Sequence, residues 1–133
     1  MPRLDHVALQ VTDLEASIAF YRDIIGLPFM FEQVDKAHNE AFAFLEVEGG
    51  NLELLQCLDP QNCEVPNAHI VPQEPYCPHI ALAVEDLDAT LRGLGEKGVH
   101  PIKGPMEIPA QVRWCYLADP DNNVLEFVQW LDP

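Results

Sequence analysis

Two histidines and two glutamates occupy matching positions in a sequence that repeats itself. The segment "HVALQVTDL" beginning at His6 and the segment "HIALAVEDL" beginning at His79 lie 73 residues apart, and "LELLQ" and "LEFVQ" place Glu53 and Glu126 at the same offset. In both copies the glutamate follows the histidine by 47 residues. Imidazole nitrogen and carboxylate oxygen bind divalent ions and transfer protons. The pattern therefore predicts a metal site made of these four side chains.

Side chains alternate along a strand, so each predicted ligand can be assigned to a face. In "LDHVALQV" His6 lies on the opposite face from apolar Val7 and Leu9, and in "NLELLQ" Glu53 alternates with leucines in the same way. If a helix covers the leucine face, the histidine and the glutamate point to the uncovered face. This donor set, which lacks a thiolate, suits one divalent nickel, cobalt, zinc, manganese or iron ion.

The elements that must position these residues are expected in the same order in each copy. The first copy predicts a strand around His6, a helix within residues 12–26 that begins after Thr12 or Asp13 and stops at Gly26, and strands in "LPFMFEQ", "EAFAFLEVE" and "NLELLQC". The second predicts a helix over 87–97 and strands near 102, over 111–119 and over 123–130.

Two segments that share one offset indicate a tandem duplication. The chain of 133 residues is long enough for one core, so we expect a single α+β domain with module 1 at about 3–58, a proline-rich linker at about 59–76 and module 2 at about 77–131. The four cysteines form no CxxC pair and are interpreted as ordinary thiols, with a zinc site at Cys57, Cys63 and Cys77 as the minor alternative.

The charge of the chain narrows the range of partners. Seven basic residues stand against 22 acidic ones, which gives a net charge of −15 and disfavours nucleic acid and anionic membranes as partners. The amino-terminal segment has no pattern of a signal peptide and no stretch of 18 apolar residues occurs, so a cytoplasmic location is expected. A small-molecule substrate remains the favoured partner.

The segments "HVALQVTDLEASIAFYRDIIGLPF", "NLELLQ", "HIALAVEDLDATLRGLGEKGV" and "LADPDNNVLEFVQ" resemble the vicinal oxygen chelate superfamily over almost the whole chain. That group includes glyoxalase I, an epimerase, thiol transferases, extradiol dioxygenases and bleomycin-binding proteins. The resemblance implies that two βαβββ modules, either from one chain or from both chains of a homodimer, form a half-open barrel around one divalent ion. The two-histidine, two-glutamate set is most similar to that of glyoxalase I.

The function predicted from these features is that of a metal-dependent lyase or isomerase of the glyoxalase I type. It would transfer a proton next to a metal-chelated carbonyl or enediolate of a small molecule, with Glu126, or else Glu53, as the base. Residues on the ligand faces are expected to bind substrate, namely Gln10, Phe44, Leu55, Trp114 and Val128. Other metal chemistry (epimerase, thiol transferase or dioxygenase) and a non-enzymatic binding or resistance role stay open as alternatives.

Overall fold

The computed structural model describes residues 1–65 and 70–132, and the chain divides into two compact units, residues 1–69 and 70–133. Unit 1 contains β1 (His6–Gln10), α1 (Leu14–Ala19), η1 (Phe20–Ile25), β2 (Phe29–Asp35), β3 (Glu40–Leu45) and β4 (Asn51–Cys57). Unit 2 contains β5 (His79–Ala83), α2 (Leu87–Glu96), β6 (Lys103–Ile108), β7 (Val112–Ala118) and β8 (Val124–Trp130). The exact boundaries predicted for the modules and the linker remain predictions.

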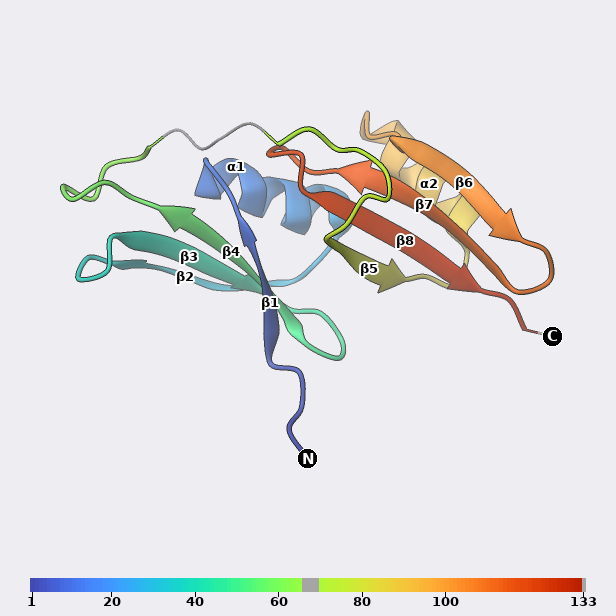
Figure 1. The fold of residues 1–133 in the computed structure, drawn as a ribbon, viewed down its shortest axis with the longest axis horizontal. Coiled ribbons are helices and arrows are strands. Elements are labelled where there is room, and N and C mark those ends of the chain that lie inside the picture. Colours follow the sequence, from blue (N-terminus) through green and yellow to red (C-terminus); the bar gives the residue numbers. More distant parts are fainter. Residues whose placement is uncertain (66–69, 133) are drawn as a thin grey trace. The chain divides into compact units, whose positions relative to one another are not determined.

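Each unit has one four-stranded sheet, and the two sheets have the same topology (Figure 1). The strand order is β1-β4-β3-β2 in unit 1 and β5-β8-β7-β6 in unit 2. The histidine strand pairs in parallel with the glutamate strand, whereas the other neighbours are antiparallel. Both sheets are open, with an edge strand on each side. The α+β class with two tandem βαβββ modules is therefore confirmed, and structural relatives share it.

One face of each sheet is buried against the helix of its own unit. In β4 the buried residues alternate with half-buried ones, so Leu52 and Leu54 face the helix while Glu53 does not. In β8, Leu125 and Phe127 are buried on the helix side, and Val124 and Val128 are buried on the opposite side. We call the face that the helix leaves uncovered the open face of the sheet. Glu53 and Glu126 thus lie on the open faces because the apolar residues beside them in β4 and β8 fill the core.

The repeated aspartate and glutamine residues hold the helices in place. Asp13 and Asp86 are N-caps whose Oδ1 atoms accept hydrogen bonds from backbone N–H groups three residues later. Gln56 Oε1 accepts from the N–H of Leu14 at 3.2 Å, and Gln129 Oε1 accepts from that of Leu87 at 2.9 Å. The "Q" shared by "LELLQ" and "LEFVQ" therefore joins the last strand to the first turn of the helix.

Several local predictions differ from the structure. The first helix does not stay regular, because its second half, η1, has the wider π-type turn before Gly26 closes it with a φ of 93°. The second helix ends at Glu96, one residue earlier than predicted. By contrast, the four cysteines are free thiols, as the sequence predicted, with Cys115 buried and the others exposed.

Among the described residues, none of the helices has the length and apolar character that crossing a membrane requires. The cytoplasmic location expected from the sequence stays a prediction.

Candidate functional site

Unit 1 brings His6 and Glu53 together on its open face. β1 and β4 run in parallel with Ala8 opposite Glu53, so the two side chains lie on adjacent strands. The His6 Nε2 atom is 3.6 Å from Glu53 Oε1, and its Nδ1 is 2.7 Å from Asp5 Oδ2. The hydrogen bond to Asp5, together with the negative charges of Glu53 and Asp5, raises the pKa of His6 against a smaller opposing effect of desolvation.

Unit 2 repeats this geometry with a different partner for the imidazole. His79 Nε2 is 3.1 Å from Glu126 Oε1, while His79 Nδ1 is 2.9 Å from the carbonyl oxygen of Tyr76. Since a carbonyl can only accept, Nδ1 carries the hydrogen and donates it to Tyr76. In the neutral imidazole, Nε2 is then the atom with a free lone pair, which is the tautomer that binds a metal through Nε2.

Each of these pairs requires a positive charge between its two members. An ionised carboxylate only accepts hydrogen bonds, so a glutamate oxygen that faces the lone pair of an imidazole at 3.1 Å is repelled unless a proton or a metal ion lies between them. The Glu53 and Glu126 side chains are 16% and 15% exposed, which makes the carboxylates partly desolvated and strengthens this requirement.

An aromatic ring of the third strand packs on each histidine. The Phe44 ring lies 5.2 Å from His6 in an edge arrangement, and the Tyr116 ring lies 5.4 Å from His79 in the same arrangement. Phe44 and Tyr116 also pair in register with Glu53 and Glu126, respectively. The aromatic side chain therefore orients the imidazole and covers one side of the carboxylate in both units.

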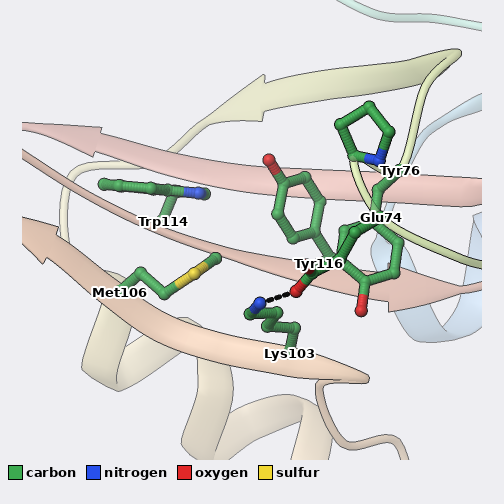
Figure 2. Close-up of a pocket in the computed structure, with 7 residues that line it drawn as sticks. Glu74, Tyr76, Lys103, Met106, Trp114 and Tyr116 are labelled. Carbon is green, nitrogen blue, oxygen red and sulfur yellow. Dashed lines mark ion pairs between the residues drawn. The ribbon is translucent and has the colours of Figure 1, made fainter.

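A pocket of about 240 Å³ opens on the open face of unit 2. It is lined by Glu74, Pro75, Tyr76, Lys103, Met106, Trp114 and Tyr116, and Figure 2 shows the Lys103 ammonium paired with the Glu74 carboxylate. Because Tyr116 also contacts His79, the pocket adjoins the histidine–glutamate pair of this unit.

A glycine in β6 allows this strand to approach the backbone of β7 closely beside the pocket. Gly104, at a φ of 100°, lies in an irregular stretch of β6, and an added Cβ would come within 3.0 Å of the Trp114 carbonyl oxygen and 3.1 Å of the Cys115 Cα. Only glycine fits this conformation and this distance without a shift of backbone. On either side of this irregular stretch, Lys103 pairs with Tyr116 and Met106 pairs with Trp114.

The five residues predicted to bind substrate lie on the strands that carry the pairs. Phe44 contacts His6, Trp114 lines the pocket, and Val128 is buried in register with Trp114. Leu55 is half-buried opposite Gln10 on the neighbouring strand, and Gln10 Nε2 donates to the Cys57 sulfur at 3.8 Å. Their contact with substrate remains a prediction.

The residues beside the two glutamates differ in their surroundings. Asn51 Oδ1 accepts a hydrogen bond from the backbone N–H of Val47. Val124 and Val128, which alternate with Glu126 along β8, are buried, whereas Trp130 at the end of the strand is exposed.

The histidines left outside the predicted set have other surroundings. His38 lies in the turn after β2, where Nδ1 is 2.8 Å from Asp35 Oδ2, and His100 is an exposed residue after α2. His69 lies outside the described residues. Within residues 1–65 and 70–132, His, Cys, Asp and Glu form no group of three or more that could hold a metal ion. Each unit thus supplies a pair, and the four-residue site stays a prediction.

Sequence reasoning missed five residues around the pairs and the pocket, namely Asp5, Glu74, Tyr76, Lys103 and Tyr116. Asp5 directly precedes His6, and the alternation of "QVRWCYLAD" could have pointed to Tyr116 beside Trp114. Tyr76 and Glu74 lie in the proline-rich linker, where no periodic pattern fixes the direction of a side chain.

Comparison with known proteins shows which family the chain belongs to. The model described as "Glyoxalase/Bleomycin resistance protein/Dioxygenase superfamily" matches residues 3–127. A curated relative, lactoylglutathione lyase of Haemophilus influenzae, is 28% identical over 134 residues, which cover 93% of this chain and 90% of the relative.

Two solved structures share the fold at lower identity. A glyoxalase family protein from Bacillus cereus superposes with a TM-score of 0.76 at 18% identity and covers 99% of this chain and 96% of its own. An antibiotic binding protein from Streptomyces sp. CB03234 superposes with a TM-score of 0.72 at 22% identity, with coverages of 98% and 97%. At these identities the likeness concerns the fold alone.

Proposed function

We propose that this protein, which belongs to the glyoxalase/bleomycin resistance protein/dioxygenase superfamily, is a divalent-metal-dependent lyase or isomerase of the glyoxalase I type. The observation that carries the proposal is the pair of matched contacts, His6–Glu53 and His79–Glu126, in which each Nδ1 is held by an oxygen and each Nε2 faces a carboxylate. The relationship to lactoylglutathione lyase supports the same class of reaction.

The donor set fits a divalent ion. Two ligands that each lie about 2.1 Å from one ion, at an angle of roughly 90–110°, are about 3.0–3.4 Å apart. The contact between His79 Nε2 and Glu126 Oε1, at 3.1 Å, falls within this range, and the contact of His6 with Glu53, at 3.6 Å, is slightly longer. We propose that both pairs hold one nickel, cobalt, zinc, manganese or iron ion. When bound, it would polarise a substrate carbonyl oxygen as a Lewis acid.

The side chains of the protein would then move and position the proton. We assign Glu126 as the base that takes a proton from the carbon next to the carbonyl and returns it to the neighbouring carbon. Glu53 and Glu126 are almost equally exposed, so burial does not distinguish them. The choice of Glu126 rests on its place beside the pocket, because Tyr116 both pairs in register with Glu126 and lines the cavity.

Hydrogen exchange at carbon tests this function directly. The protein is loaded in turn with nickel, cobalt and zinc and is then incubated in deuterium oxide with candidate substrates. These are small 2-oxo acids, hydroxyacyl thioesters and thiol adducts of 2-oxoaldehydes. NMR follows the exchange of hydrogen for deuterium at carbon. We expect a chelator to stop the exchange with at least one of these compounds. Binding of a compound without exchange under any metal would overturn the proposal and favour a binding or resistance protein.

The apolar edge of unit 1 supports a homodimer as a further part of the proposal. The edge strand β2 exposes Phe29, Met30, Phe31 and Val34. An exposed edge strand with large apolar side chains associates with other chains unless something covers it. The mass of the protein in solution, from light scattering, should be twice that of the chain, and Phe31→Glu should lower it.

A further inference from the structure

Lys103 is in an unusual position for a basic residue of this chain. It pairs in register with Tyr116, so its side chain lies on the open face of the sheet in unit 2. The other six basic residues lie on helices, in loops, or on the helix side of a sheet: Arg3, Arg22, Lys36, Arg92, Lys97 and Arg113. In a protein with a net charge of −15, one basic side chain therefore lines the pocket of unit 2.

The partner of Lys103 can be exchanged at little cost. Glu74 forms an ion pair with Lys103, but the two side chains are 62% and 41% exposed. An ion pair between groups that keep this much solvent contact contributes little to stability. A ligand anion of the same charge and geometry can therefore replace the Glu74 carboxylate at the ammonium group.

The rest of the pocket suits an aromatic body. Trp114 and Tyr116 point to the same face from alternate positions of β7, and the Tyr76 ring packs 4.8 Å from that of Tyr116 (Figure 2). Met106 completes the wall with a flexible thioether, which adapts to ring edges. The volume of about 240 Å³ is below the range of about 300–1,000 Å³ for drug-sized ligands, so one ring with a short arm fills it.

The pocket also has a defined direction toward the histidine–glutamate pair. Lys103, Tyr116 and Glu126 occupy one row across β6, β7 and β8, because Tyr116 pairs in register with both of the others. Two strand spacings separate the ends of this row, about 10 Å between backbones. A ring lying over Tyr116 would therefore reach an anion-binding group at one end and the Glu126 carboxylate at the other.

We propose that this pocket binds an aromatic monocarboxylate, with the ring against Tyr116 and Trp114 and the carboxylate at Lys103 in place of Glu74. The placement of a second oxygen group near Glu126 rests on the proposed function, whereas the recognition of ring and carboxylate does not. Lys103 is then a specificity-determining residue, and Glu74 competes with the ligand.

A matched pair of probes tests the proposal with the whole protein. Binding of 3-phenylpropanoate and of its neutral isostere 3-phenylpropanamide is measured by calorimetry in excess chelator, so failure of metal binding cannot affect the result. We expect the acid to bind about fivefold more tightly than the amide. In Lys103→Met this preference should disappear, whereas Lys97→Met, at the end of α2, should keep it.

The variant Glu74→Gln tests directly whether Glu74 competes with the ligand carboxylate for Lys103. Removal of the competing carboxylate should tighten binding of the acid by about fivefold and leave the amide unchanged. A purely structural ion pair would instead give weaker binding of both compounds. The proposal is overturned if neither compound binds, if Lys103→Met keeps the preference for the acid, or if Glu74→Gln weakens binding of the acid. Circular dichroism of both variants verifies that they fold.

Discussion

The two units share a scaffold and differ in what surrounds the same pair of side chains. In both, an aspartate caps the helix, a glutamine ties the last strand to the helix, and a histidine faces a glutamate across parallel strands. Around the pair, unit 1 presents three phenylalanines, with Phe31 stacked on Phe44 at 5.2 Å and Phe42 edge-on to both. Unit 2 presents tyrosines, a tryptophan and a lysine that enclose a pocket.

The difference indicates that the two units acquired different roles after the duplication. Residues that recur in both units either stabilise the fold or form the histidine–glutamate pair. The residues of the third strand of each unit, β3 or β7, and those of the linker have diverged. The three phenylalanines of unit 1 offer apolar contact to a ligand, whereas Lys103 and the tyrosine hydroxyls of unit 2 can also bind its polar groups. We therefore expect substitutions of the pairs to have similar effects in both units and substitutions around them to differ.

The largest expected difference between the units concerns the glutamates. Glu126→Gln should lower the rate of proton exchange at the substrate carbon by about 10²–10⁴-fold, because the general base is lost. Its amide oxygen can still coordinate a metal, so metal content should fall little. Glu53→Gln should retain more exchange activity. Near-normal exchange in Glu126→Gln combined with loss in Glu53→Gln would reverse the assignment.

A smaller effect is expected from the group that holds the first imidazole. Asp5→Asn removes the charge that orients and polarises His6, and should weaken metal affinity by about tenfold in competition with a chelating dye. The corresponding contact of His79 Nδ1, at 2.9 Å, is with the backbone carbonyl oxygen of Tyr76, which no side-chain substitution removes. An unchanged affinity in Asp5→Asn would show that this hydrogen bond does not support a ligand.

The repeated glutamines should contribute unequally to stability. Gln56 is 3% exposed and both accepts from Leu14 and donates to the Thr12 carbonyl at 2.8 Å. Gln56→Leu leaves these groups without a partner and should lower the free energy of unfolding by about 1–3 kcal/mol. Gln129→Leu, at a less buried position, should cost about 1 kcal/mol. Urea titrations of both variants measure the difference, and an equal or reversed order would contradict this comparison.

The smallest effects concern the charged contacts between helix and sheet, which have opposite pH dependence in the two units. In unit 2, the hydrogen bonds and charge of Arg113 lower the pKa of Asp88. This stabilisation is present above the unfolded pKa of Asp88 and is lost as the pH falls through the folded pKa. Arg113→Gln should therefore lower the melting temperature slightly at pH 7 and not at pH 2.

In unit 1, the hydrogen bond to the Glu15 carboxyl raises the pKa of Glu32, and desolvation adds to this shift. The folded state then binds a proton more tightly than the unfolded one, so stability is lost as the pH rises through the folded pKa. Glu15→Gln should raise the melting temperature slightly at pH 7 and not at pH 3. If both variants shifted the melting temperature in the same direction at pH 7, the contrast between the units would be wrong.

The fold was predictable because the repeat supplies each element twice. Alternation in "LDHVALQV" and "NLELLQ" was enough to assign His6 and Glu53 to one face. The helix start was predicted at Thr12 or Asp13 and its end at Gly26, and the structure has Asp13 as the N-cap and Gly26 as the C-cap. The pocket was not predictable in the same way. Glu74 and Tyr76 come from the linker, and the contact of Tyr76 with Tyr116 depends on tertiary packing that no local pattern encodes.

The most direct test of the central claim is the metal content of the unmodified protein and of three variants after saturation with nickel and dialysis, measured by mass spectrometry of the metal. If both pairs share one ion, the unmodified protein should hold one ion per set of four ligands, and both His6→Ala and His79→Ala should lose it. The matched control His38→Ala should keep it, because His38 lies in a turn beside Asp35. Unchanged metal content in either ligand variant, or two ions per set of four ligands in the unmodified protein, would contradict the account.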